Sequence, residues 1–191
     1  MGKTVKKPAL ARERILETAL LLFYAHGTRG VGIDRIIAES GVAKMSFYNH
    51  FPSKADLVAA FLEARHERWM AWFTEALEAR KAKSGGHLAA VADVLRTWFA
   101  TADFHGCAFI NILAETDRSA SRERGIAQRH KEDLLAALIE QARKDEVTRP
   151  TEAGRHALIV VEGAIVRAEM TGDGDRAAAD AKALLKAIAA Q

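Results

Sequence analysis

The stretch that decides the fold is Ile33-Asp34-Arg35-Ile36-Ile37-Ala38-Glu39-Ser40-Gly41-Val42-Ala43-Lys44-Met45-Ser46-Phe47-Tyr48-Asn49-His50-Phe51. It predicts two short helices, at about 33–40 and 43–50, joined by a tight turn at 40–42. Gly41 supplies the backbone freedom that such a turn needs. Four apolar side chains are spaced to bury the angle between the two helices: Ile36, Ile37, Val42 and Phe47.

The other face of the second helix is polar and only modestly charged. It carries Lys44, Met45, Ser46, Tyr48, Asn49 and His50. A helix that reads base edges in the major groove needs this mixture of hydrogen-bonding and apolar side chains. The alternative is a helical hairpin whose polar face merely meets water, which fits most short helix pairs. The glycine turn, the basic flanks and the helix cap just downstream favour the DNA-reading interpretation.

The charge of the chain is divided unevenly. Residues 1–54 hold nine Lys and Arg against four Asp and Glu, a net charge of +5. The other 137 residues hold 19 bases and 21 acids, a net charge of −2, so the chain total is +3. A basic first quarter is where a nucleic-acid contact is expected. Lys3, Lys6 and Lys7 form a basic arm that either tracks DNA or is a solvated tail.

Composition and the positions of helix-breaking and helix-capping residues predict an all-α protein. Ala, Leu, Glu, Arg and Lys dominate, and alternating β-branched runs are absent. Proline and a capping box at Ser53-Lys54-Ala55-Asp56 place the start of a long fourth helix. We expect three parts: a basic flexible arm at 1–10, a three-helix helix-turn-helix domain at 11–52, and a larger helical domain at 53–191.

Several classes of protein are disfavoured. No apolar run approaches the roughly 18 residues that cross a bilayer, and no signal-peptide core is present, so we expect a cytoplasmic protein. The single cysteine, Cys107, cannot form a disulfide within the chain. His66-Glu67-Arg68-Trp69-Met70 lacks the second histidine of a zinc-protease motif. We therefore expect no enzyme activity, no cofactor and no metal, and nothing in the sequence gives Cys107 a redox role.

The stretch from Ile15 to Leu57 resembles the DNA-binding domain of the TetR (tetracycline repressor) family of bacterial transcriptional regulators. The resemblance rests on these segments: Ile36-Ile37-Ala38, Gly41-Val42, Phe47-Tyr48-Asn49-His50-Phe51 and Ser53-Lys54. It covers about a quarter of the chain. It implies a transcriptional regulator that binds a double-stranded DNA operator as a homodimer, with a ligand-binding and dimerisation domain at 53–191.

The resemblance also implies roles for single residues. Lys44, Met45 and Ser46 begin the recognition helix, where base contacts are expected. Tyr48 and His50 correspond to a phosphate-contacting pair, and Lys54 adds a phosphate contact at a helix start. The full set expected at DNA is Thr28, Arg29, Gly32, Lys44, Met45, Ser46, Tyr48, Asn49, His50 and Lys54.

Three positions depart from the family pattern. Gly32 stands where Ser or Thr usually caps the second helix, which removes one hydroxyl contact to phosphate. Ile37 replaces a small alanine and Phe47 replaces a leucine, so we expect altered packing between the two helices.

Aromatic side chains gather in the middle of the chain, with eight between Phe61 and Phe109 and none after. Such a stripe is usually core, but helical regulators of this family bind small molecules in an apolar pocket after the DNA-binding domain. The resemblance implies a pocket that includes His66, Trp69, Phe73, Trp98, Phe99, Phe109, Asn111 and Glu115.

The last two helices carry apolar faces that suit either intrachain packing or a four-helix dimer interface. The interface set that we expect is Leu158, Val161, Ile165, Leu184, Leu185 and Ile188. A two-fold dimer would place its recognition helices about 34 Å apart on a near-palindromic operator. Ligand binding would then change that separation and release the repressor.

Two other functions stay open at this point. One is a helix-turn-helix regulator controlled by a protein partner, or without any ligand. The other is an all-helical enzyme, although the sequence offers no nucleophile–base pair or metal set. Neither the effector, the operator nor the direction of regulation follows from the sequence.

Overall fold

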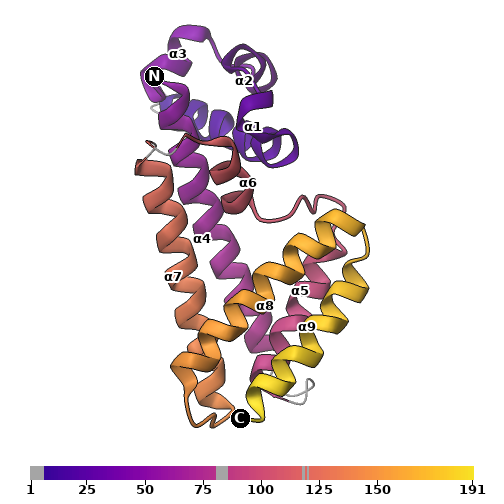
Figure 1. The fold of residues 1–191 in the computed structure, drawn as a ribbon. Coiled ribbons are helices and arrows are strands. Elements are labelled where there is room, and N and C mark those ends of the chain that lie inside the picture. The colour runs from indigo at the N-terminus through magenta and orange to yellow at the C-terminus, as the bar shows by residue number, and fades with distance from the viewer. Residues whose placement is uncertain (1–6, 81–85, 118, 120) are drawn as a thin grey trace, which may run out of the picture. The chain divides into compact units, whose positions relative to one another are not determined.

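The computed structural model describes residues 7–80, 86–117, 119 and 121–191, and every regular element in this part is an α-helix (Figure 1). The all-α prediction is therefore confirmed. Lys3 and Lys6 of the expected basic arm lie outside the described residues. The helices are α1 (Lys7–Gly30), α2 (Ile33–Ser40), α3 (Lys44–His50), α4 (Lys54–Arg80), α5 (His87–Phe99), α6 (Ala108–Glu115), α7 (Ser121–Lys144), α8 (Pro150–Thr171) and α9 (Gly174–Ala189). No helix among them is long and apolar enough to span a bilayer.

The contacts within the chain divide it into two compact units. The first comprises Met1–His66 and Ala108–Ala127, and the second comprises Glu67–Cys107 and Gln128–Gln191. The first unit thus takes in the beginning of α4, all of α6 and the beginning of α7, besides the three helices expected at 11–52. A segment that is distant in sequence completes the N-terminal unit.

In the first unit, α1 packs against α2, α3 and α6. The face of α1 predicted to be apolar is buried, with Ile15 and Ala19 fully enclosed and Leu22 and Phe23 nearly so. The ring of Phe23 meets Phe61 of α4 edge to face, with centroids 5.6 Å apart. These apolar contacts form the small core on which the helix-turn-helix rests.

The start of α4 is capped as its sequence predicts. The Ser53 hydroxyl accepts a hydrogen bond from the Asp56 backbone N–H at 3.1 Å and donates one to the Asp56 carboxylate at 2.7 Å. Arg122 of α7 pairs with the same carboxylate at 2.9 Å. These bonds hold the pKa of Asp56 below its ordinary value, the Ser53 hydroxyl contributing most.

In the second unit, α9 packs against both α5 and α8, and α8 and α9 run antiparallel beside each other (Figure 1). Lys182 of α9 donates to both carboxylate oxygens of Asp93 on α5, at 2.9 and 2.7 Å. Asp145 accepts the backbone N–H groups of His87 and Leu88 at 2.6 and 2.8 Å, which caps the start of α5. A carboxylate thus caps the start of α5, and an ion pair joins the middle of α5 to α9.

Candidate functional site

The turn between α2 and α3 has the geometry that the sequence predicts. Gly41 adopts the left-handed conformation (φ 62°, ψ 31°), and its N–H closes α2 by donating to Ala38 and Ile37 carbonyls. Ile36 and Phe47, one from each helix, are both completely buried. The two helices are therefore held at a fixed angle by a buried pair across a glycine turn.

The polar face of α3 is presented to solvent. Met45 is 72% exposed and Tyr48 is 37% exposed, while Phe47 anchors the opposite side of the helix. Lys44 and Asn49 are also exposed. The remaining members of the face, Ser46 and His50, are half-buried. Every α3 residue that we expected at DNA thus has an accessible surface.

The charges around α3 leave Lys44 available to a ligand. Its ammonium lies 3.7 Å from the Asp34 carboxylate, and both side chains are mostly exposed. An exposed ion pair of this length contributes little and is readily exchanged for a phosphate. Arg35 of α2, in contrast, pairs with Glu39 of its own helix at 2.7 Å.

The start of α2 lacks a side-chain cap. Gly32 is the N-cap residue in an extended conformation, and no side chain accepts a hydrogen bond from the first turn. A Cβ built at Gly32 would meet nothing within 4 Å. There is therefore room for a serine or threonine side chain at this position, and packing does not require glycine there.

Thr28 and Arg29 follow a break in α1 at Gly27, which has a positive φ of 71°. The break leaves two backbone N–H groups without helical partners, and the Glu115 carboxylate of α6 accepts both, at 2.7 Å from Thr28 and 3.0 Å from Arg29. The Thr28 hydroxyl donates to the same oxygen at 2.7 Å. Thr28 is 8% exposed, so its hydroxyl is directed to Glu115, whereas Arg29 is exposed.

These contacts also set the ionisation of Glu115. Burial raises the pKa of this carboxyl, but the hydrogen bonds from Thr28 and Arg29, with the charge of Arg29, outweigh burial and hold the pKa below its ordinary value. No local sequence pattern indicates this pairing, because the partners are 87 residues apart.

The residues expected at the ligand pocket fall into both units. Trp69, Phe73, Trp98 and Phe99 belong to the second unit and form one cluster of rings. The other four belong to the first unit: His66, Phe109, Asn111 and Glu115. Phe109 is buried, and Asn111 is exposed.

The ring cluster contains members that sequence reasoning missed. His130 of α7 is 3% exposed and meets the Trp69 ring edge to face at 5.4 Å. Helical spacing could have found it, since His130 precedes the buried Leu134 and Leu138 at intervals of four residues. Phe104, in the segment after α5, meets Trp98 at 5.1 Å.

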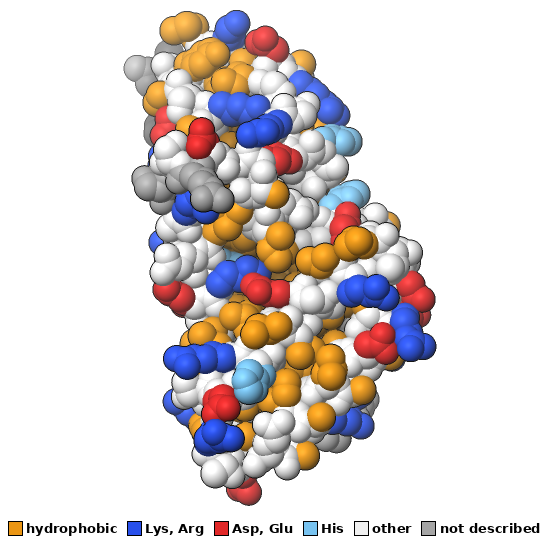
Figure 2. Space-filling view, viewed as in Figure 1, with side chains coloured by type: hydrophobic (Ala, Val, Ile, Leu, Met, Phe, Trp, Pro, Cys, Tyr) orange, Lys and Arg blue, Asp and Glu red, His pale blue; other side chains and the backbone are white. Residues whose placement is uncertain are grey.

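The last two helices turn most of the expected interface residues inward. Val161, Ile165, Leu185 and Ile188 are buried within the chain. Leu158 is half-buried, and only Leu184 of the set is exposed, at 54%. Exposed apolar side chains occupy the neighbouring positions of α8 instead: Ile159, Val166 and Met170. Hydrophobic side chains gather over α8 and α9 on the face seen in Figure 2.

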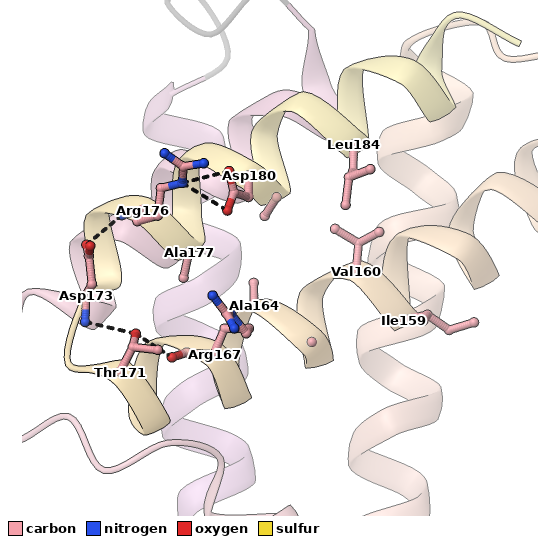
Figure 3. Close-up of a pocket in the computed structure, with 12 residues that line it drawn as sticks. Ile159, Val160, Ala164, Arg167, Thr171, Asp173, Arg176, Ala177, Asp180 and Leu184 are labelled. Atoms are coloured by element: carbon pink, nitrogen blue, oxygen red, sulfur yellow. Dashed lines mark hydrogen bonds and ion pairs between the residues drawn. The ribbon is translucent and has the colours of Figure 1, made fainter.

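A groove runs between α8 and α9. In Figure 3, Val160 and Leu184 point toward one another across it, and Ile159 points away. At its other end, Arg176 pairs with Asp180 at 3.1 Å, and the Asp173 backbone N–H donates to the Thr171 hydroxyl at 3.1 Å. The groove is therefore apolar along one part and polar along the other.

Cys107 has a basic neighbour that its sequence context does not reveal. The thiol is buried, and the Lys131 ammonium lies 3.6 Å from its sulfur. Lys131 is shared with Glu162 at 3.1 Å. Among the described residues, no group of three or more His, Cys, Asp or Glu could hold a metal ion.

A helix pair joined by a glycine turn, with a buried anchor and an exposed polar reading face, defines a helix-turn-helix DNA-binding regulator. Residues 15–61 match the family model described as bacterial regulatory proteins, tetR family. The chain belongs to the TetR family of transcriptional regulators, as the resemblance predicts, because a solved TetR-type regulator is also 30% identical to it over 93% of its length. Its function is that of a TetR-type regulator of transcription, and this family consists of regulators rather than enzymes.

The likeness extends over the whole chain. A TetR-type transcriptional regulator from Streptomyces avermitilis is 30% identical and superposes with a TM-score of 0.76, covering 93% of this chain and 97% of that one. The TetR-family regulator SCO4454 from Streptomyces coelicolor is 29% identical with a TM-score of 0.84, covering 99% and 96%. The transcriptional regulator LmrA of Bacillus subtilis is 27% identical over 159 residues, 82% of this chain and 85% of that protein.

Proposed function

We propose that the protein is a homodimeric repressor that binds a near-palindromic DNA operator through α3 and leaves it when a small molecule binds in the second unit. The observation that carries the DNA-binding part is the exposed polar face of α3 opposite the buried Phe47. Because Phe47 anchors α3 on its buried side, the opposite side of this helix can enter the major groove without a change in packing.

The residues of this face divide by chemistry into base-reading and phosphate-contacting groups. Lys44, Met45 and Ser46 open the recognition helix, where Ser46 can bond to any base and Met45 can contact a thymine methyl. Tyr48, Asn49 and His50 follow them along the same helix. Arg29 and Lys54 supply exposed or half-exposed positive charge at the flanks. Thr28 and Arg29 both donate to Glu115, so this carboxylate holds the segment that carries Arg29.

Homodimers are usual among TetR-family regulators, and the exposed apolar side chains of α8 support a two-fold interface here. Ile159, Gly163, Val166 and Met170 recur at intervals of four, three and four residues, which is one seam of a helix. A Cβ at Gly163 would meet nothing within 4 Å, so a partner helix can approach closely at this point. Leu184 extends the apolar surface onto α9.

Repression follows from occupancy of the operator, and release requires that the effector bind one state of the dimer better than the other. The ring cluster of the second unit supports an effector site, because small-molecule sites in helical proteins are mostly apolar and aromatic with few polar groups. Control by a protein partner is the alternative, and it would leave this cluster without a ligand.

The deciding experiment is selection of DNA bound by the full chain from a random pool. We expect two inverted half-sites whose centres lie about one helical turn, or about 10 base pairs, apart. Analytical ultracentrifugation with a selected duplex should give two chains per DNA. Selected sequences without inverted symmetry, or one chain per duplex, would contradict the two-fold model. Activation by the protein of a promoter that contains the site would contradict the repressor assignment.

A further inference from the structure

The indole N–H of Trp69 is a buried hydrogen-bond donor that has no acceptor. Trp69 lies on α4 in the second unit and is 8% exposed. Its Nε1 atom is shielded from solvent and meets no hydrogen-bond partner. Buried polar groups in proteins are nearly always paired, because an unpaired one loses its bonds to water and gains nothing in return. A phenylalanine at this position would fill an apolar core without that cost.

The surroundings of Trp69 are almost entirely aromatic. Its ring stacks on Phe73 at 4.8 Å and 13°, and it meets Trp98 edge to face at 5.4 Å. His130 closes another side, also edge to face at 5.4 Å. Phe73, Trp98 and His130 are all buried. The donor therefore lies among ring faces and edges contributed by three helices, α4, α5 and α7.

Two members of the cluster reach the surface. Trp72 and Phe104 are half-buried, and each contacts Trp98, at 6.4 and 5.1 Å between ring centroids. Phe104 lies in the segment that follows α5, outside any helix. Phe104, unlike the fully buried Phe73, therefore gives the cluster a solvent-accessible edge beside Trp98.

The charge of the surroundings limits what can bind. Among the described residues of the second unit, no Asp, Glu, Lys or Arg is buried. A ligand that carried a charge into this cluster would therefore lose hydration without gaining an ion pair. Neutral, planar and aromatic molecules match the rings, and an acceptor atom is what the Trp69 N–H lacks.

We propose that the effector is a neutral planar aromatic molecule with an acceptor oxygen, which stacks among Trp69, Trp98 and Phe104 and accepts a hydrogen bond from Trp69 Nε1. This inference rests on the proposed effector control and adds the chemical class of the effector and the residue that selects it. Trp69 provides the specificity, because it distinguishes a ring with an acceptor from the same ring without one.

The test uses two probes that differ in one group, 9-fluorenone and fluorene, with a carbonyl in place of a methylene. We expect the full-length protein to bind fluorenone about tenfold more tightly than fluorene in calorimetric titrations, the difference that one good hydrogen bond to a formerly unpaired donor produces. In proton–nitrogen NMR spectra, the indole signal of Trp69 should move downfield with fluorenone and much less with fluorene.

The variant Trp69→Phe keeps an aromatic ring and removes the donor. We expect it to bind fluorenone and fluorene equally, while Trp72→Phe, the matched control on the same helix, keeps the tenfold preference. Thermal unfolding of Trp69→Phe should remain cooperative, at a somewhat lower temperature than that of the natural chain, because the smaller ring leaves a cavity. An equal affinity of the natural chain for both probes, or an unchanged preference in Trp69→Phe, would overturn the inference.

A DNA-binding measurement separates this inference from the proposed function. Selected operator DNA is titrated with the same preparations in the presence and absence of fluorenone. Operator binding by a protein that fails to distinguish the two probes would leave the DNA-binding function standing and reject the Trp69 site. A tenfold probe preference with no effect on operator affinity would establish the site and reject effector-driven release.

Discussion

Glu115 of α6 and Thr28, just past the break in α1, are joined by two hydrogen bonds to a single carboxylate oxygen. The Thr28 backbone N–H and its hydroxyl both donate to Oε2 at 2.7 Å. The Arg29 N–H adds a third bond at 3.0 Å. A Cβ at Gly27 would collide with the same carboxylate and displace it from these bonds, and the positive φ also favours glycine there. The carboxylate therefore replaces the helical partners that the break removes.

Replacement of this carboxylate should loosen the segment that carries Arg29. Glu115→Ala leaves the buried Thr28 hydroxyl and two N–H groups without their acceptor, and we expect a loss of about 1–3 kcal/mol in the free energy of unfolding. Operator affinity should fall as well, because Arg29 loses its fixed position. Urea denaturation and DNA titration measure the two effects. Asp117→Asn, an exposed acid just after α6, is the control and should change neither.

The lowered pKa of Glu115 predicts a pH dependence. A carboxyl whose pKa is lower in the folded chain than its reference value of 4.5 contributes its full stability above that pH, and loses it as pH falls through the folded value. Glu115→Gln should therefore flatten the stability profile below about pH 4.5. Asp56 also has a lowered pKa, so the comparison is made in an Asp56→Asn background. Identical acid profiles with and without Glu115 would contradict this assignment.

The open space at Gly32 predicts a gain on substitution. In Gly32→Ser the hydroxyl can accept a backbone N–H of the first turn of α2, which stabilises the protein by a few tenths of a kcal/mol. The same hydroxyl can donate to a DNA phosphate, so operator affinity should increase. Gly30→Ser is the control, since a Cβ at Gly30 also meets nothing within 4 Å but caps no helix. Equal affinities for both variants would reject a role of residue 32 at the DNA backbone.

Lys54 tests the phosphate assignment. Removal of one phosphate contact should lower operator affinity and reduce the slope of log affinity against log salt by about one in Lys54→Ala. An unchanged salt slope in Lys54→Ala would show that its charge lies away from DNA.

Ser46 and Tyr48 test the other contacts of α3 in the same titrations. Ser46→Ala should change the preferred base at one position of each half-site, with a smaller effect on the salt slope than Lys54→Ala. Tyr48→Phe removes a hydroxyl only and should weaken binding to all sequences alike.

Met170 tests the interface between two chains. Its side chain is 79% exposed on α8, so Met170→Glu should leave the fold of a single chain intact. If the exposed apolar seam joins two protomers, the buried charge will dissociate the dimer, which sedimentation velocity detects directly. Leu21→Glu, at a position 72% exposed on α1, is the matched control and should stay dimeric. Dimers of both variants at low micromolar concentration would place the interface elsewhere.

Local sequence patterns were enough to predict the helix-turn-helix. The helix ranges 33–40 and about 43–50, the Gly41 turn, the buried Phe47 and the Ser53 cap were all predicted, and the structure has each of them. These features depend on neighbours within a few residues, where periodicity and turn chemistry are informative. The same reasoning placed Thr28 among the residues expected at DNA, but it could not reveal the bond from Thr28 to Glu115, which lies far along the chain.

The faces of α8 and α9 show the limit of such reasoning. Both helices carry apolar residues on more than one side, so the sequence could not tell which side meets α5 and which meets solvent. In the structure, Val161 and Ile165 are buried while Val166 and Met170 are exposed. Amphipathic spacing identifies a helix, but it does not choose between two apolar sides.

Local spacing was sufficient to predict that the chain is helical, where the helix-turn-helix lies and that α3 has a polar face opposite Phe47. It could not predict that Glu115 accepts hydrogen bonds from Thr28 and Arg29, that Trp69 lies against His130 with its N–H unpaired, or that Met170 is exposed. Those relationships join residues that are distant in sequence, and only the packing of whole helices brings them together or keeps them apart.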